Sequence, residues 1–153
     1  MVTIKKQKSF SYIPIGVWLT GSTLMWSQGF TGNGCVVGVI DSGIDSSHSD
    51  IKNNVKKRIS YVGDENYEDL HFHGTHVAGT IGANGKLKGV APNATIYDYR
   101  VFDGKGFSRP FAIERAIRKA ADDGCNIINM SLGGFKEYPE LVLYFPVYIY
   151  AIL

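Results

Sequence analysis

The segment 36–43, VVGVIDSG, decides the fold class of this chain of 153 residues. Its first five residues are apolar and mostly β-branched, with no alternation of polar side chains, so they predict a strand buried on both faces. A glycine-rich turn precedes the strand, and Asp41, Ser42 and Gly43 end it. Such strands are typical of parallel sheets covered by helices on both sides, where functional side chains gather at the carboxyl ends of the strands.

The rest of the chain alternates strands with helices around this segment. We predict further strands over residues 94–102 and 125–130, and a short helix of small residues over 74–83. A second helix is expected between Ser108, as its N-cap, and Gly124, as its stop. The apolar face of that helix is formed by Ile113, Ala116, Ile117 and Ala120. This order of elements predicts an α/β fold.

The composition excludes several classes of protein. Hydrophobic residues make up 44% of the chain and charged residues 20%, which is enough apolar character to bury a core. A net charge of +2 is too small to indicate a nucleic-acid surface. The two cysteines, Cys35 and Cys125, exclude a disulfide framework and a zinc ribbon. A compact soluble domain is therefore expected.

Two stretches without charged residues resemble membrane or export signals. Residues 9–40 follow three lysines as a secretory signal would, but Pro14 and glycines interrupt the apolar run and no cleavage site follows. The C-terminal residues 141–153 are uncharged and aromatic, but they are too few to span a bilayer and Pro146 divides them. We expect neither a cleaved signal nor a membrane anchor.

Three segments carry the chemistry. Residues 39–45 (VIDSGID) place a carboxylate after the buried strand, and residues 73–79 (HGTHVAG) place a histidine at a helix start. Residues 131–134 (SLGG) follow the last predicted strand. With these segments in this order, residues 15–134 resemble the subtilisin-like serine proteases, or subtilases, whose catalytic aspartate precedes the histidine.

This resemblance implies a serine endopeptidase that hydrolyses peptide bonds. His73 would act as the general base, and Asp41 would orient its ring and stabilise the imidazolium. Gly74 and Gly79 would let the helix pack tightly behind the histidine. The residues that would bind an extended polypeptide substrate as an added strand are Ser131, Leu132, Gly133 and, on the other side, Gly106.

The resemblance also implies a subtilisin-like three-layer sandwich with a mostly parallel sheet, truncated here to its N-terminal half. Residues 1–14 would form an N-terminal extension, 15–134 the N-terminal part of the catalytic domain, and 135–153 a divergent apolar tail. Subtilases carry their nucleophilic serine in a G-T-S-x-A-x-P segment and their oxyanion asparagine in A-A-G-N. Neither segment occurs in this sequence, so the chain alone is expected to be inactive.

Self-association is a further expectation. Without a following core strand, the strand over 125–130 would have an unpaired edge. The tail over 141–153 is apolar and prone to β-aggregation. We expect a polypeptide in extended conformation as the main partner, self-association through the exposed edge, and no nucleic-acid or membrane partner.

Two segments of the sequence contain partial metal-binding patterns. His71, His73 and His76 are near a zinc motif of metallo-β-lactamase-like hydrolases, but Thr75 replaces the aspartate that the motif requires. Asp50 matches a calcium ligand of subtilases, but the loop over 83–88 is short and contains two lysines. We expect Asp50, like its neighbours Asp45 and His48, to be a solvated loop residue. No metal or other cofactor is expected.

Three questions remain open at this point. A non-catalytic pseudo-protease that binds peptides is the alternative function. The short N-terminal extension is similar to that of the intracellular subtilisins and favours the cytoplasm, with secretion as the alternative. If the strands pair as in subtilases, Cys35 and Cys125 would be neighbours, and we expect free thiols because a bond between adjacent parallel strands would be strained.

Overall fold

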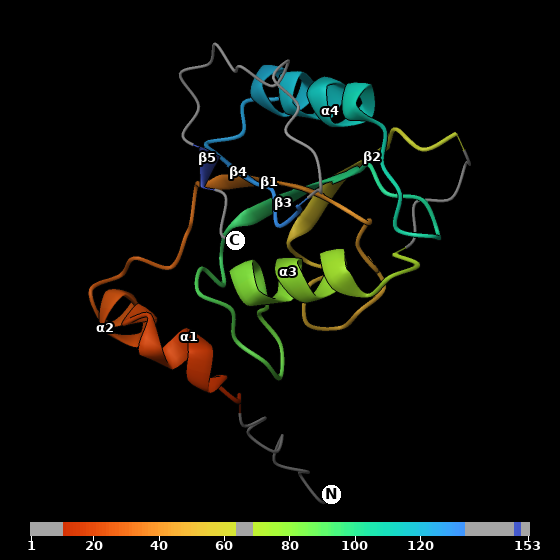
Figure 1. Ribbon diagram of the computed structural model, residues 1–153. Coiled ribbons are helices and arrows are strands. Elements are labelled where there is room, and N and C mark those ends of the chain that lie inside the picture. The colour runs from red at the N-terminus through yellow and green to blue at the C-terminus, as the bar shows by residue number, and fades with distance from the viewer. Residues whose placement is uncertain (1–10, 64–68, 134–148, 151–153) are drawn as a thin grey trace, which may run out of the picture.

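A parallel sheet between helices forms the part of the chain that the computed structural model describes, residues 11–63, 69–133 and 149–150 (Figure 1). Its strands follow the order β2-β3-β1-β4-β5, and each of their pairings is parallel. The α/β class with a mostly parallel sheet is thus confirmed. The strands are β1 (Val36–Asp41), β2 (Val55–Ser60), β3 (Thr95–Arg100), β4 (Ile127–Asn129) and β5 (Ile149–Tyr150).

One helix covers each face of the sheet, which gives the three predicted layers (Figure 1). On one face, α4 (Pro110–Asp122) buries the alanines of its apolar side against Ile40, Tyr99 and Ile128. On the other face, α3 (His73–Gly82) packs through Ala78 in a second cluster with alternate residues of β1 and β3. Because β1 lies between the two layers, all of its residues after Val36 are buried, as its apolar sequence predicts.

The ends of α4 show one expected and one unexpected feature. Gly124 follows the C-cap residue Asp123 and has a φ of 76°, so it ends α4 in the left-handed conformation, as predicted. Ser108 is not the N-cap. The helix begins at Pro110 with Arg109 in the capping position, because the proline ring presets the backbone of the first turn. The Ser108 hydroxyl is buried and has no hydrogen-bond partner among the described residues.

Besides β5, three elements were not anticipated from the sequence. Strand β2 carries three consecutive basic residues and is only partly buried, so it lacks the apolar pattern of β1. Helices α1 (Ile15–Leu19) and α2 (Ser22–Ser27) are short and lie beside the α3 layer (Figure 1). The Trp26 indole, from α2, donates a hydrogen bond of 2.8 Å to the Val90 carbonyl and so ties this segment to the domain. None of the described helices has the length and apolar character of a membrane span.

The expected unpaired edge of β4 is wrong, because β5 covers it. Ile149 lies opposite Ile128, and Tyr150 opposite Asn129, in parallel register. Pairing with the C-terminal segment supplies the neighbour that the sequence analysis assumed to be missing. The remainder of the predicted tail, residues 135–148 and 151–153, lies outside the described residues.

The expected register of the two cysteines is confirmed, because Val37, two residues after Cys35, pairs with Ile127, two residues after Cys125. Both are free, but Cys35 packs with the cluster under α3 and Cys125 with the cluster under α4. They therefore lie on opposite faces of the sheet. The chain enters β4 directly from the turn after α4, which places Cys125 against Tyr99, with its sulfur 3.6 Å from the tyrosine hydroxyl oxygen.

Candidate active site

The end of β1 and the start of α3 bring together Asp41 and His73. Asp41 Oδ1 lies 2.8 Å from His73 Nδ1. The Asp41 side chain is only 2% exposed, whereas the His73 side chain is 54% exposed. A buried carboxylate thus orients an imidazole whose remaining nitrogen is accessible from outside, which is the arrangement that a general base requires.

A pocket of about 190 Å³ opens beside this pair. Of the residues predicted to bind substrate, Gly106, Ser131 and Leu132 lie in its wall, whereas Gly133 does not. Gly106 has a φ of 79°, and a β-carbon there would lie 3.4 Å from the His71 ring, so a larger residue would crowd the pocket. The complete lining is Asp41, Ser42, His71, His73, Phe102, Gly106, Ser131 and Leu132.

Asp69, which no sequence motif singled out, holds the start of α3. The carboxylate accepts hydrogen bonds from the backbone N–H of Thr75 at 2.8 Å and of His71 at 3.0 Å. Between these two points Phe72 has a φ of 62°, an unusual conformation for an aromatic residue. The available signal was an acidic residue just before a predicted helix, where it complements the helix dipole.

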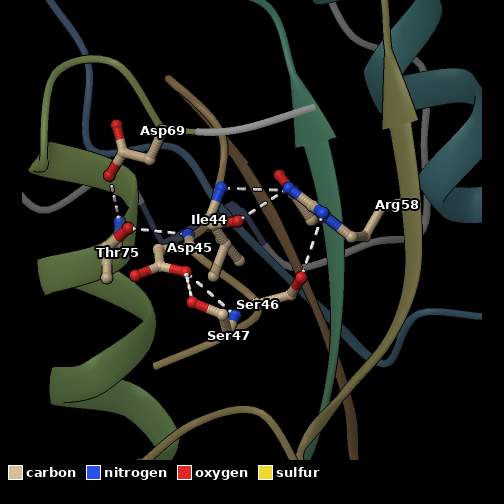
Figure 2. Close-up of polar contacts among 8 residues, drawn as sticks. Ile44, Asp45, Ser46, Ser47, Arg58, Asp69 and Thr75 are labelled. Atoms are coloured by element: carbon tan, nitrogen blue, oxygen red, sulfur yellow. Dashed lines mark hydrogen bonds and ion pairs between the residues drawn. The ribbon is translucent and has the colours of Figure 1, made fainter. Parts of the chain in front are cut away.

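The loop after β1 is fixed from two sides (Figure 2). From β2, the Arg58 guanidinium donates hydrogen bonds of 2.8 Å to the Ile44 carbonyl and 3.0 Å to the Ser46 hydroxyl. From α3, the Thr75 hydroxyl accepts a bond of 2.9 Å from the Asp45 N–H. These contacts come from elements distant in sequence, and they set the path of the chain directly after Asp41.

Comparison with known proteins identifies the family. Residues 32–144, more than half of the chain, match the subtilase family. The chain belongs to the subtilase family. It is 43% identical to subtilisin E of Bacillus subtilis (strain 168) over 127 residues, covering 80% of this chain and 33% of that protein. It is 36% identical to the major intracellular serine protease of the same organism over 149 residues, covering 92% of this chain and 47% of that protein.

A third relative extends the range of lengths. The minor extracellular protease Vpr of the same strain is 36% identical over 132 residues, which cover 78% of this chain but 16% of that protein. This subtilase chain therefore spans less than half the length of each of these relatives. Its predicted division into residues 1–14, 15–134 and 135–153 stays a prediction.

The three histidines of the zinc hypothesis are not brought together. His73 faces Asp41, and His71 lies in the wall of the pocket beside it. His76 instead lines a different hollow on another side of α3. No group of three or more His, Cys, Asp or Glu side chains within the described residues could hold a metal ion. This arrangement fits the subtilase pair rather than a zinc centre.

Asp50 is a buried anchor and not the solvated residue expected from the sequence. It is 7% exposed, and its two carboxylate oxygens accept the backbone N–H groups of Lys86 at 2.9 Å and Leu87 at 3.1 Å. Burial opposes ionisation, but these bonds outweigh it and lower the pKa of Asp50. The loop's own amides thus bind both carboxylate oxygens of Asp50, an arrangement that does not fit a subtilase calcium site.

A larger hollow, of about 720 Å³, runs along α3, and neither Asp41 nor His73 lines it. Residues of α1, α3 and the loop over 83–88 form its walls, and Phe72 at its edge is 81% exposed. The lining is mainly apolar, as in surfaces that other parts of a protein cover. In this subtilase chain α3 is thus packed on its sheet side and open on another.

Proposed function

We propose that this chain carries the aspartate and histidine of a subtilisin-type serine endopeptidase. The observation that carries the proposal is the hydrogen bond of 2.8 Å between the buried Asp41 and the accessible His73. Membership of the subtilase family supports serine-type peptide hydrolysis for the complete enzyme. Asp41 orients the ring and stabilises its charged form, and His73 moves the proton.

In the proposed reaction, His73 Nε2 accepts the proton of a serine hydroxyl as the serine oxygen bonds to the substrate carbonyl carbon. His73 then donates this proton to the leaving amine, and the acyl-enzyme is hydrolysed by water through the same two transfers. The Nδ1–H bond to Asp41 keeps Nε2 unprotonated and directed outward at the start of each cycle. This chain supplies the acid–base pair for both halves of the reaction.

The proposed substrate is an extended polypeptide. Ser131 and Leu132 follow β4 at the rim of the pocket, where their backbone groups could pair with a substrate strand. Gly106 also lines this pocket, and its lack of a side chain leaves room for that strand. Gly133 is exposed beyond the pocket, so its predicted role depends on a substrate that extends past the wall.

The nucleophile is proposed to lie outside this sequence. None of the 153 residues forms the serine or oxyanion motif of the family, and the chain is much shorter than its relatives. The apolar hollow along α3 supports this proposal, because an exposed apolar surface is typical of a face that another part of a protein covers. We therefore propose that the chain by itself does not hydrolyse peptides, and that a fluorophosphonate probe forms no adduct with it.

A chimaera tests the catalytic assignment. Residues 11–133 would be joined to the C-terminal remainder of subtilisin E, and cleavage of a chromogenic peptide would be measured. Subtilisin itself loses on the order of 10⁴-fold in kcat without its aspartate and 10⁶-fold without its histidine, so we expect losses of that order for Asp41→Asn and His73→Ala. The matched control is His76→Ala, which removes a histidine outside the pocket and should leave kcat within about threefold.

The results separate the two candidate functions. An active chimaera that needs both Asp41 and His73 supports the protease. If the chimaera folds but is active without His73, the assignment is wrong. If it binds peptide without turnover while subtilisin E turns over under the same conditions, the peptide-binding pseudo-protease is favoured, because Ser131 and Leu132 retain the substrate wall.

We further propose a cytoplasmic location. The match to the major intracellular serine protease covers 92% of this chain, whereas the match to subtilisin E covers 80%. Fractionation of the source cells with an antibody against the chain tests this. Recovery from the medium as a shorter form that lacks the N-terminal residues would contradict it and support secretion.

A further inference from the structure

A bridge of three hydrogen bonds joins the end of β1 to the start of α3. The Ser42 N–H donates to Asp41 Oδ1 at 2.7 Å, and the Ser42 hydroxyl donates to Asp69 Oδ1 at 2.8 Å. The same hydroxyl oxygen accepts the Gly74 N–H at 3.0 Å. Ser42 is thus bonded to the carboxylate of the catalytic pair and to the residue directly after its histidine.

Asp69 is the anchor of this bridge. Besides Ser42, it binds the backbone N–H groups of His71 and Thr75, which flank the turn leading into α3. Burial opposes its ionisation, but bonds from Thr75, Ser42 and His71 outweigh burial and lower the pKa of Asp69. A charged acceptor makes each of these bonds stronger than a neutral one would.

Capping a helix would not require the bond to Ser42. Asp69 caps α3 directly, because it accepts the helix N–H of Thr75 and the N–H of His71 in the turn before the helix. The Ser42 bond instead reaches the segment that carries Asp41 and orients the serine oxygen to accept the Gly74 N–H. Ser42 therefore links the segment that carries Asp41 to the start of α3, which carries His73. The link lies directly beside both side chains in the sequence.

We propose that Asp69 is a positioning residue that acts through Ser42 to hold His73 against Asp41. Asp69 keeps the imidazole at the distance and angle at which Nδ1, and not Nε2, carries the proton. This inference rests on the proposed function, in which Asp41 orients His73. It adds that the orientation depends on a carboxylate that touches neither the reacting atoms nor the histidine ring.

The tautomer of His73 is the readout, because a residue that only caps the helix would not change it. Long-range proton–nitrogen NMR spectra of ¹⁵N-labelled protein at pH 8 show which ring nitrogen of a neutral histidine is protonated. In the wild-type chain we expect mainly the Nδ1–H form. In Asp69→Asn and in Ser42→Ala, we expect the ratio of Nδ1–H to Nε2–H to fall about tenfold, the effect of losing one hydrogen bond of ordinary strength.

Two comparisons separate positioning from loss of charge. Ser42→Ala removes no charge, so a fall in the ratio there cannot come from electrostatics at a distance. Asp103→Asn is the matched control, because Asp103 also accepts two backbone N–H groups, from Lys105 and Phe107, and has no bond to Ser42. This control should leave the tautomer ratio unchanged. Adding Asp69→Asn to Ser42→Ala should produce little further change, since both act along one path.

The outcomes distinguish this inference from the proposed function. If Asp69→Asn and Ser42→Ala lower stability but leave the Nδ1–H tautomer dominant, Asp69 only caps α3 and the inference is wrong. If the folded wild-type chain has the Nε2–H tautomer, the Asp41–His73 pair itself is wrong and both proposals fail. If Asp69→Asn does not fold, Ser42→Ala decides, because it leaves the bonds of Asp69 to α3 in place.

Discussion

Gly74, the second residue of α3, lies so close to Gly43 that a β-carbon on Gly74 would be 2.1 Å from the Gly43 carbonyl oxygen. No side chain larger than hydrogen fits this contact. The absence of a side chain lets the start of α3 touch the loop that follows β1. Since His73 directly precedes Gly74 and Asp41 lies two residues before Gly43, this contact determines how near Asp41 and His73 can come.

Replacing Gly74 by alanine should therefore separate the two segments. The added methyl group must displace backbone, so we expect Gly74→Ala to lower the free energy of unfolding by about 2–3 kcal/mol. The hydrogen bond between Asp41 and His73 should weaken at the same time. Urea unfolding measures the first effect, and the NMR tautomer of His73 measures the second.

Gly79→Ala is the matched control in the same helix. The sequence analysis assigned Gly79 the same packing role as Gly74, but a β-carbon on Gly79 would meet nothing within 4 Å. That expectation is wrong, because Gly79 faces the open hollow. Alanine is the better helix former, so we expect Gly79→Ala to raise the free energy of unfolding by about 0.5–1 kcal/mol. Equal destabilisation by both substitutions would contradict the close contact at Gly74.

Phe72 should be replaceable with a gain in stability. Its φ of 62° costs an aromatic residue about 1 kcal/mol, and its side chain is 81% exposed, so little burial offsets that cost. Asparagine adopts this conformation more readily. We expect Phe72→Asn to raise the free energy of unfolding by up to about 1 kcal/mol, measured by urea unfolding.

Phe107→Asn provides the comparison for Phe72. Phe107 is 72% exposed, and Phe72 is the one described residue other than glycine with a positive φ. Phe107→Asn therefore removes a similar amount of exposed apolar surface as Phe72→Asn does. It relieves no backbone strain. A similar gain at both positions would show that loss of exposed apolar surface, and not relief of strain, is responsible.

The third prediction concerns Asp98 and pH. Asp98 is 1% exposed, and burial raises its pKa to about 7, although the nearby Arg58 guanidinium, 3.3 Å away, opposes the shift. The folded protein then binds a proton between pH 4 and 7 that the unfolded chain has released. The resulting stabilisation is complete below pH 4 and is lost as the pH rises through 7.

Asp98→Asn removes this titration and retains a neutral side chain of similar shape. Relative to the variant, the wild-type chain should lose stability from pH 5 to 7 by about 1.4 kcal/mol per pH unit at most. Urea unfolding at each pH gives the free energy of unfolding of both proteins. In their difference, the contributions of the other titrating groups cancel. Parallel pH profiles would show that Arg58 keeps Asp98 ionised in the folded state.

The fourth prediction concerns the two thiols. Burial raises the pKa of both Cys35 and Cys125, so both should react slowly with a disulfide reagent at neutral pH. Cys125 is 7% exposed under α4, whereas Cys35 is only partly buried. We expect Cys35 to react at least about tenfold faster in the folded protein, and both to react rapidly in denaturant. Cys35→Ser should therefore remove the fast phase of the reaction. If it removes the slow phase instead, Cys35 is the slower thiol and the prediction is wrong.

The pattern of apolar residues was enough to predict a strand of the sheet only where the strand is buried on both faces. β1 is surrounded by other elements, so its residues had to be apolar and its pattern is unambiguous. β2 has a partly solvated face and reads as a basic loop, although Arg58 reaches back from it to the loop after β1. The start of α4 was predicted wrongly because Ser108 was expected to cap the helix. The helix instead begins at Pro110, whose ring fixes φ at a helical value.

The sequence by itself determined which residues are chemically able to act. The carboxylate after a buried strand and the histidine at a helix start were identified as Asp41 and His73 from motif and order alone, and the structure places them 2.8 Å apart. Motifs record the residues that a reaction needs, because few side chains can replace them. Ser131 and Leu132, which lie in the wall of the same pocket, could be found in the same way.

Only the tertiary structure decided how these residues are held. Asp69 binds Ser42, and Arg58 binds Ile44, across intervals in which the sequence shows no periodic signal. Asp50 became a buried anchor, and the cysteines fell on opposite faces, for the same reason. Hydrogen bonds and packing depend on which segments the folded chain brings within a few ångströms, and the short-range patterns of a sequence do not record those distances.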